Sequence, residues 1–141
     1  MYEKILVPSD GSECSEKALE HAVKLAEKFE SEIHLLYVVD VRMNTAGEYY
    51  SNLVGTMREQ GEDRLKEKAE EISSKDVDVQ TSVIEGIPHT EINDYSDEYD
   101  TDLIVMGTHG RTGLNRLLIG SVTEKIVRTS KVPVLTVGDD H

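Results

Sequence analysis

The sequence predicts an α/β fold with one doubly wound, five-stranded parallel sheet in the order 3-2-1-4-5 and helices on both faces. Short apolar runs alternate along the chain with longer segments of helical periodicity, which is typical of repeated βαβ units. Three of the five runs are almost continuously apolar and suit central strands. The third run alternates with polar residues and the fifth contains Pro133, so both belong at sheet edges. Right-handed crossovers then favour this strand order.

The opening residues predict the first strand and the first helix. Residues 5–7 form a short apolar run that ends at Pro8, which indicates a buried strand. Apolar residues then recur at helical spacing, so we expect residues 13–30 to form an amphipathic helix that Ser12 or Ser15 can cap.

The middle of the chain predicts two further strands around a less regular segment. Residues 33–39 are a second near-continuous apolar run. Between residues 41 and 61 the pattern is weak, which predicts a mobile loop running into a highly charged helix at about residues 59–74. Residues 77–83 alternate between apolar and polar types and are expected to form the third strand, with one face less buried.

The last third of the chain predicts two helices and two strands. Pro88 suits the first turn of a helix that runs to about residue 99. The fourth strand is expected at residues 102–106, the last helix at 121–130 and the fifth strand at 132–137. The last helix opens on the sequence S-V-T-E, a capping-box pattern in which the Ser121 hydroxyl can accept from the N–H of Thr123 or Glu124.

Length and composition limit the class of protein. A chain of 141 residues is expected to form one domain, residues 1–141, and its single cysteine excludes an internal disulfide framework. The chain has no apolar run near 20 residues and no charged-then-apolar leader, so we expect a cytoplasmic protein without a membrane partner. A formal net charge of −13 argues against nucleic acid as a partner.

The charge is distributed unevenly. Residues 107–131 hold five basic side chains and one acid, whereas the rest of the chain holds 10 basic and 27 acidic side chains. This basic segment coincides with a glycine-rich stretch that could take an anion. The alternative is that some of these side chains, such as Arg128 and Lys131, only complement the carboxyl end of the last helix.

The glycine-rich stretch follows the fourth strand and has a fixed spacing. Gly107 is followed by two residues, Gly110 by nine, and then come Gly120 and Ser121 at the start of the last helix. This spacing fits neither the Walker loop nor the dinucleotide fingerprint. A strand that breaks at a glycine and re-enters a helix at Gly-Ser leaves backbone N–H groups in one small volume, which predicts a phosphate cradle.

Three stretches together resemble the universal stress protein family. They are I-L-V-P-S-D-G-S at residues 5–12, the G-2x-G-9x-G-S motif at residues 107–121 and V-P-V-L-T-V at residues 132–137. The resemblance implies a Rossmann-like fold of the adenine nucleotide alpha hydrolase type that binds ATP. The predicted strand order agrees with it, because its crossovers reverse between the first and fourth strands and ligands settle at such a reversal.

The resemblance implies a set of nucleotide-binding residues. Pro8, Ser9 and Asp10 would lie against adenosine, with Asp10 near the sugar or a metal ion, and the backbone of Val38 would contact adenine. Met106 offers a soft thioether surface for the purine or ribose. The alternative roles are a cap on the first helix for Asp10 and core packing for Val38 and Met106.

The remaining candidate residues belong to the phosphate side. Gly107 and Gly110 would let phosphate oxygens approach the backbone, and His109 could donate to a phosphate or instead bond to the backbone of its own loop. The intervening loop could close over a triphosphate through Arg111, Thr112, Asn115 and Arg116. The helix start would contribute Gly120, Ser121, Val122 and Thr123.

The leading interpretation is an ATP-binding regulatory or stress-adaptation module, with Mg²⁺ or Mn²⁺ arriving on the phosphates near Asp10. No catalytic residue is assigned. One alternative is a slow Mg²⁺-dependent ATPase or phosphotransferase, for which His109 and Asp10 are the only candidate bases. A third hypothesis is a nucleotide-independent dimeric interaction module.

Self-association is expected through the fifth strand. Residues 132–137 form a short apolar edge that needs cover, and the resemblance implies that subunits pair through this strand as a two-fold homodimer. The alternative is a monomer whose edge is covered by the C-terminal tail.

Overall fold

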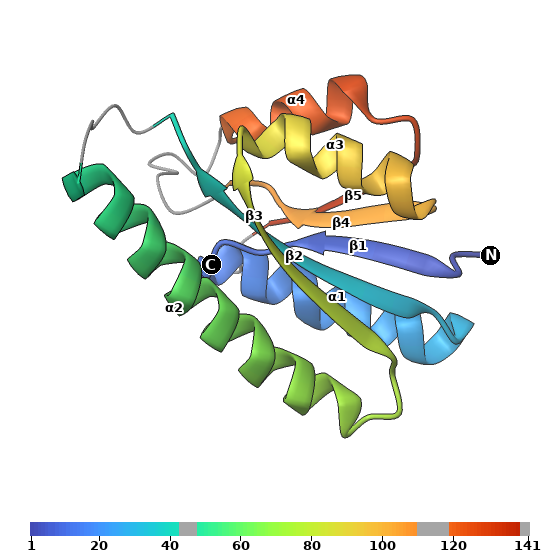
Figure 1. Cartoon of the computed structure of the whole chain (residues 1–141). Helices are drawn as coiled ribbons and strands as arrows, with labels where there is room; N and C mark the ends of the chain where they lie inside the picture. The colour runs from blue at the N-terminus through green and yellow to red at the C-terminus, as the bar shows by residue number, and fades with distance from the viewer. Residues whose placement is uncertain (43–47, 110–118, 139–141) are drawn as a thin grey trace.

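A computed structural model describes residues 1–42, 48–109 and 119–138 of the chain, and Figure 1 shows its arrangement. The sheet has five parallel strands in the order β3-β2-β1-β4-β5, which confirms the predicted fold class. The elements are β1 (Lys4–Pro8), α1 (Glu13–Phe29), β2 (Glu32–Asp40), α2 (Glu48–Ser73), β3 (Val79–Gly86), α3 (Pro88–Tyr99), β4 (Leu103–Gly107), α4 (Ser121–Thr129) and β5 (Val134–Val137).

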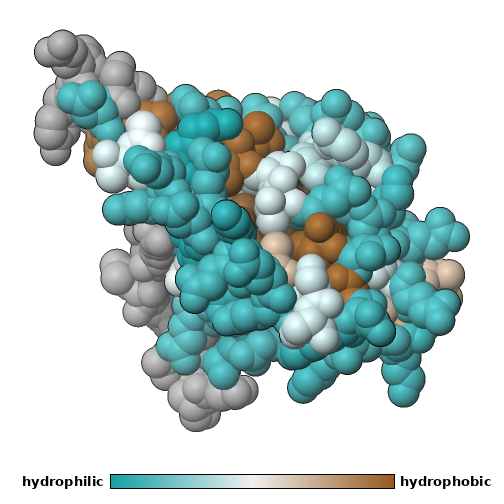
Figure 2. Space-filling view, turned by 60° about the horizontal axis from the view of Figure 1, so that its bottom comes forward, coloured by the Kyte–Doolittle hydropathy of each residue, from teal (hydrophilic) through white to brown (hydrophobic). Residues whose placement is uncertain are grey.

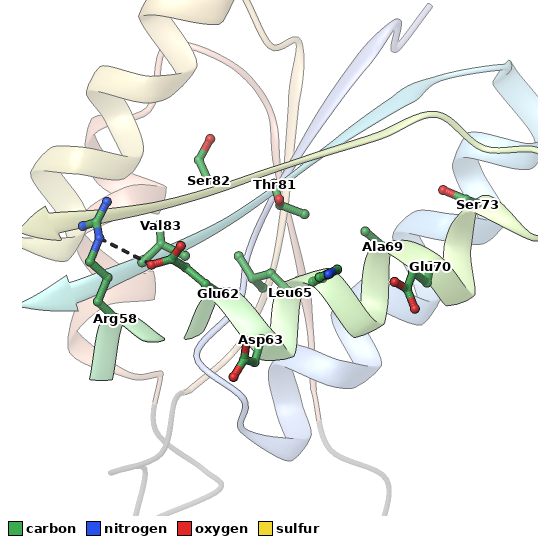
Figure 3. A pocket seen from close by; sticks show the side chains of 11 residues that line it. Arg58, Glu62, Asp63, Leu65, Ala69, Glu70, Ser73, Thr81, Ser82 and Val83 are labelled. Atoms are coloured by element: carbon green, nitrogen blue, oxygen red, sulfur yellow. Dashed lines mark ion pairs between the residues drawn. The ribbon is translucent and has the colours of Figure 1, made fainter. Parts of the chain in front are cut away.

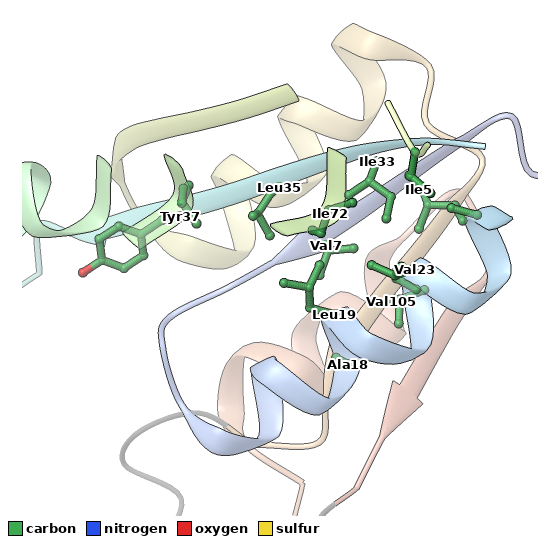
Figure 4. Packing of buried hydrophobic residues seen from close by; sticks show 14 of the residues in the cluster. Ile5, Val7, Ala18, Leu19, Val23, Ile33, Leu35, Tyr37, Ile72 and Val105 are labelled. Atoms are coloured by element: carbon green, nitrogen blue, oxygen red, sulfur yellow. The ribbon is translucent and has the colours of Figure 1, made fainter. Parts of the chain in front are cut away.

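The helices cover the sheet in two layers. Helices α1 and α2 lie on one face, and α3 and α4 lie on the other (Figure 1). Because side chains alternate across a strand, β1 sends Ile5 and Val7 to the first face and Leu6 to the second. Figure 4 shows part of the larger cluster, in which Val7 and Leu35 pack against Leu19. The three central strands are therefore buried on both faces, as their composition predicts.

The first helix begins and ends as its sequence suggests. Ser12 is the N-cap, and its side chain accepts a hydrogen bond from the Ser15 backbone N–H at 3.2 Å. Glu30 ends the helix in the left-handed conformation, with a φ angle of 57°. Of the two predicted caps, the structure selects Ser12.

Helix α2 begins much earlier than predicted. Its 26 residues start at Glu48, whereas the sequence pattern predicted a loop running into a helix that begins at about residue 59. Val54, Leu65 and Ile72 lie on one stripe and are all buried, so the apolar periodicity does extend back into this segment. Gly61 weakened the prediction, because a glycine inside a helix costs about 1 kcal/mol relative to alanine. Despite the length of α2, no helix in the described ranges is apolar enough over a sufficient length to cross a membrane.

The two edge strands are placed as predicted, although the bounds of both differ from the prediction. Strand β5 begins at Val134, and Pro133 precedes it, with its carbonyl oxygen accepting from the Ile104 N–H at 3.0 Å. Proline is tolerated there because only its carbonyl is needed. At the other edge, β3 is partly exposed along its length.

Candidate functional site

Two chain segments meet where the crossovers reverse, at the carboxyl edge of the sheet. Strands β1 and β4 are neighbours, so the turn after Pro8 and the segment after Gly107 leave the sheet side by side. Cys14 in the first turn of α1 joins them, because its Sγ lies 3.6 Å from the Thr108 hydroxyl. Cys14 Sγ also donates to the carbonyl oxygen of Val137 at 3.2 Å. The predicted adenosine side and the predicted phosphate side therefore share one edge.

The turn between β1 and α1 is held by hydrogen bonds to β2 and within the turn itself. The Ser9 N–H donates to the carbonyl oxygen of Leu36 at 2.8 Å, and Ser9 is buried. One carboxylate oxygen of Asp10 accepts from the Ser12 N–H at 2.9 Å. Gly11 has a φ angle of 82°, a conformation that glycine adopts without strain. Asp10 therefore stabilises the turn that leads to the N-cap, Ser12, and this role is compatible with a ligand contact.

Gly107 is explained by packing against α1. A Cβ atom added there would lie 2.8 Å from Cys14 Sγ and 2.9 Å from the carbonyl carbon of Cys14. The sequence-based reason for this glycine was room for phosphate oxygens. In the structure, the space that a side chain would need is filled by the first turn of α1 instead.

The side chain of Thr123 is bonded to the end of β4. Its hydroxyl donates to the carbonyl oxygen of Gly107 at 2.8 Å, and the residue is buried. This bond ties the first turn of α4 to the end of β4. The hydroxyl of Thr123 therefore has a structural partner, and what the residue offers at the site is its backbone N–H.

The capping-box prediction for the last helix is wrong. The N-cap of α4 is Gly120, in extended conformation, and no side chain caps it within the described residues. The helix starts one residue earlier than a Ser121 cap requires, because the Glu124 N–H donates to the carbonyl oxygen of Gly120 at 2.9 Å. Ser121, Val122 and Thr123 occupy the first three helical positions, whose N–H groups have no acceptor inside the helix. Such a helix start favours an anion.

The backbone of His109 lies against the residue that begins this helix, Gly120. A Cβ atom on Gly120 would lie 3.0 Å from His109 Cα, and the Gly120 N–H donates to the carbonyl oxygen of Thr108 at 2.7 Å. Glycine at position 120 thus lets α4 begin against the backbone of the strand end. The predicted residues Gly110 and Arg111 lie outside the described residues, as do Thr112, Asn115 and Arg116.

Val38 and Met106 have buried side chains in the smaller core cluster, between the sheet and helices α3 and α4. Their side chains therefore have the packing role that was the alternative for both. The predicted contact of Val38 with adenine concerned its backbone, and residue 38 lies near the carboxyl end of β2, the edge at which Ser9 bonds to Leu36. Pro8 ends β1 at this edge.

The sequence did not reveal one residue that contacts the site. Arg64 reaches the turn from α2, and its Nη2 donates to the carbonyl oxygen of Ser9 at 3.2 Å. Its guanidinium carbon lies 4.7 Å from the centre of the Tyr37 ring, in cation–π geometry. Within a helix of many charged residues, no sequence signal separates Arg64 from its neighbours.

A surface pocket lies elsewhere, between α2 and β3. It has a volume of about 680 Å³ and is lined by side chains of both signs (Figure 3). Arg58 forms ion pairs there with Glu62 at 3.6 Å and with Glu85 at 3.2 Å. The space-filling view in Figure 2 shows exposed hydrophobic residues among mainly hydrophilic ones on one face of the molecule. None of the residues predicted to bind nucleotide lines this pocket.

A metal ion at this edge would need oxygen atoms of a bound molecule as ligands. Among the residues that the structure describes, no three His, Cys, Asp or Glu side chains are grouped to hold one. Asp10 is a single carboxylate at the turn, which fits an ion that is carried mainly by phosphate oxygens and not one held by a protein cage.

Comparison with known proteins gives consistent matches over almost the whole chain. Residues 1–138 match the universal stress protein family. The universal stress protein MJ0531 of Methanocaldococcus jannaschii is 38% identical over 97% of this chain and 82% of its own length. The protein MJ0577 of the same organism is 33% identical over 97% of this chain and 95% of its own length.

Solved structures match in the same way. Universal stress protein UspA from Lactobacillus plantarum superposes with a TM-score of 0.91 and 27% identity, covering 96% of this chain and 97% of its own. The structure of MJ0577 has a TM-score of 0.88 and 34% identity, covering 100% and 99%. Two more distant structures, both with TM-scores of 0.67, are a universal stress protein in complex with cAMP, at 22% identity, and one from Archaeoglobus fulgidus in complex with dAMP, at 18% identity. These two support the fold.

Proposed function

The chain belongs to the universal stress protein family, and from that premise we propose that it binds ATP at the β1–β4 edge and acts as a nucleotide-dependent regulatory module in stress adaptation. The observation that carries the proposal is the first turn of α4. It presents three backbone N–H groups without a side-chain cap, beside the strand end that bears the glycine motif. A helix start of this kind is suited to phosphate groups.

The proposed arrangement has two sides. Pro8, Ser9, Asp10 and the backbone of Val38 receive adenosine, while Met106 supports it from the end of β4. The phosphates lie against the backbone of the segment after β4, on residues Gly107, His109, Gly110, Arg111, Gly120, Ser121, Val122 and Thr123. Two distant structures of this fold are complexes with cAMP and dAMP, which supports an adenine nucleotide as the class of ligand. Mg²⁺ or Mn²⁺ would arrive with the triphosphate, and Asp10 is the nearest predicted ligand.

Two experiments test the proposal in sequence. Mass spectrometry of small molecules released from freshly purified, denatured protein is expected to detect an adenine nucleotide. Titration calorimetry with ATP, ADP, AMP and cAMP, with and without Mg²⁺, then ranks them, and we expect ATP with Mg²⁺ to bind most tightly. Protein that carries no nucleotide and takes up none at millimolar ATP contradicts the proposal and favours a nucleotide-independent module.

A matched pair of variants examines Asp10. Asp10→Asn keeps an oxygen that can accept from the Ser12 N–H, so the turn is retained while the charge is lost. We expect the benefit of Mg²⁺ for ATP binding to shrink in this variant. Asp40→Asn is the control, because Asp40 is a second carboxylate at this edge, at the end of β2, and forms an ion pair with Arg42 at 2.7 Å. Equal Mg²⁺ dependence in both variants would remove Asp10 from the metal role.

The proposal concerns binding and not rapid turnover. A hydrolysis assay with Mg²⁺ on the parent and on His109→Ala separates the two. Turnover of many molecules per second in the parent that disappears in the variant would instead favour the ATPase alternative.

We also propose a two-fold homodimer through β5. This strand is a short sheet edge that is only partly buried, and α4, which contacts it, carries Val127 at 51% exposed. A hydrophobic edge of this kind is suited to a second copy. Light scattering after gel filtration is expected to give about twice the chain mass of 15.8 kDa. A mass of one chain at micromolar concentration contradicts the dimer.

A further inference from the structure

Helix α2 contributes one side chain to the turn that is proposed to receive adenosine. Arg64 Nη2 donates to the carbonyl oxygen of Ser9 at 3.2 Å, across 55 positions of sequence. Resting on the proposed function, we propose that Arg64 is a positioning residue for the nucleotide site. It holds the β1–α1 turn in the conformation that receives adenosine, without contacting the nucleotide itself.

Ser9 is held through both of its backbone groups. Its N–H donates to the Leu36 carbonyl in β2, and its carbonyl accepts from Arg64 in α2. Because Ser9 is only 4% exposed, its carbonyl has little access to water that could replace the guanidinium. The path of the chain into Asp10 therefore depends on a donor from another element.

The guanidinium is itself positioned. It stacks on the ring of Tyr37, with 4.7 Å between the guanidinium carbon and the ring centre, and Tyr37 is buried. Arginine suits this place better than lysine, since its planar group can stack and donate at once. The Tyr37 ring thus holds the Arg64 guanidinium where it can donate to the Ser9 carbonyl.

The approach of α2 to Tyr37 depends on Gly61, one turn before Arg64. A Cβ atom at Gly61 would overlap the Tyr37 ring, and its distance from Cε2 would be 2.7 Å. This close contact accounts for a glycine in the middle of a long helix. Gly61, Tyr37 and Arg64 together form one unit that connects α2 to the turn.

If Arg64 positions the turn, its replacement is expected to change the affinities for AMP and ATP in a specific way. A residue that contacted phosphates would affect ATP more than AMP, because charge contacts grow with the number of phosphate groups. A residue that acts through the adenosine-side turn affects both nucleotides by the same factor. We expect Arg64→Met to raise the Kd of AMP and of ATP about tenfold each.

The test compares three variants of the full chain. Arg64→Met removes the donor and the charge but keeps a long stem, and Arg64→Lys restores a donor without the planar group. Arg58→Met is the matched control, because Arg58 lies on the same helix with ion pairs to Glu62 and Glu85 and does not reach the turn. Calorimetry with AMP and ATP is expected to rank the affinities as parent and Arg58→Met first, then Arg64→Lys, then Arg64→Met.

Hydrogen exchange gives a readout that needs no nucleotide. The backbone amide of Ser9 is bonded to the Leu36 carbonyl in β2 and that of Ser12 to the Asp10 carboxylate, so we expect both to exchange at least tenfold faster in Arg64→Met and at the parental rate in Arg58→Met. Parental exchange in Arg64→Met overturns the inference, as does faster exchange with unchanged Kd values. A parent that binds no nucleotide overturns the proposed function instead, and the exchange rates alone then decide whether Arg64 holds the turn.

Discussion

The two segments at the carboxyl edge of the sheet are built in different ways. The turn after β1 is held by three hydrogen bonds: the Ser9 N–H donates to the Leu36 carbonyl in β2, Arg64 in α2 donates to the Ser9 carbonyl, and the Ser12 N–H donates to Asp10 within the turn. The segment after β4 is joined to α4 by bonds at its two ends, from Thr123 to Gly107 and from Gly120 to Thr108. The first segment is held by the side chains of Asp10 and Arg64, whereas the described ends of the second are brought together at glycines that let backbone approach backbone.

The glycines at this edge show the same difference. Gly11 provides a positive φ angle in the first turn. Gly107 and Gly120 instead leave space for neighbouring chain, one for Cys14 and the other for the backbone of His109. Two glycines of the motif at residues 107–121 therefore serve packing, and changing them is expected to affect the fold as well as any ligand contact.

The largest expected effect comes from filling the space at Gly107. We expect Gly107→Ala to lower the free energy of unfolding by about 3 kcal/mol, because the new Cβ would meet both the sulfur and the backbone of Cys14. Urea denaturation followed by circular dichroism measures it. Gly55→Ala is the control, since nothing lies within 4 Å of its Cβ position in α2, and it should stabilise the protein by up to about 1 kcal/mol. Equal effects of both changes would contradict the packing explanation.

The next effect concerns the bond that ties α4 to β4. Thr123→Val keeps the shape of the side chain but leaves the Gly107 carbonyl without its donor, at an expected cost of about 2 kcal/mol in the free energy of unfolding. Thr123→Ser keeps the hydroxyl and should cost less. The same urea titration compares them, and a valine variant as stable as the parent would show that the bond contributes nothing.

The sequence predicted the fold well because strand composition reports burial directly. The near-continuous runs at 5–7, 33–39 and 102–106 do lie in the centre of the sheet, and the run with Pro133 lies at an edge. The start of α2 could not be predicted, because Gly61 lowers helix propensity and its compensating partner, Tyr37, lies on another element. A contact across the fold has no local signature.

The site was predicted only in outline for a similar reason. Topology placed both segments at one edge, but the cap of α4 was misplaced because the contact of Gly120 with the backbone of Thr108 and His109 has no sign in the pattern S-V-T-E. Arg58 and Arg64 look alike in a charged helix, yet one pairs with glutamates at the surface and the other reaches Ser9. Which of them matters depends on the rotation of the helix against the sheet.

A buried histidine on β2, outside the two segments, is expected to make the stability of the protein depend on pH. His34 is buried on β2, with its Nδ1 2.7 Å from the Tyr95 hydroxyl and its Nε2 3.3 Å from a Glu32 carboxylate oxygen. Burial lowers the pKa of His34 below its usual 6.5, although Glu32 acts in the opposite direction. The folded state therefore binds this proton less readily than the unfolded state.

Stability should accordingly fall as the pH drops below about 6.5 towards the lowered pKa of His34. His34→Gln removes the titration while keeping a polar side chain, so its free energy of unfolding should vary less between about pH 7 and pH 5. Urea midpoints at several pH values measure this. An unchanged slope in the variant would assign the acid sensitivity to other groups.

The smallest expected effect separates stability from anion binding at the start of α4. Glu124 and Arg128 form an exposed pair with 2.7 Å between their charged atoms, and such a pair contributes about 0.5 kcal/mol or less. Glu124→Gln should therefore leave the urea midpoint almost unchanged. Because it removes a negative charge from the turn proposed to face phosphates, it should tighten ATP binding about twofold at low salt, and AMP binding less. Equal changes in the affinities for ATP and AMP would contradict the placement of the phosphates at the start of α4. The proposed division into an adenosine side held by side chains and a phosphate side built from backbone groups would then be wrong.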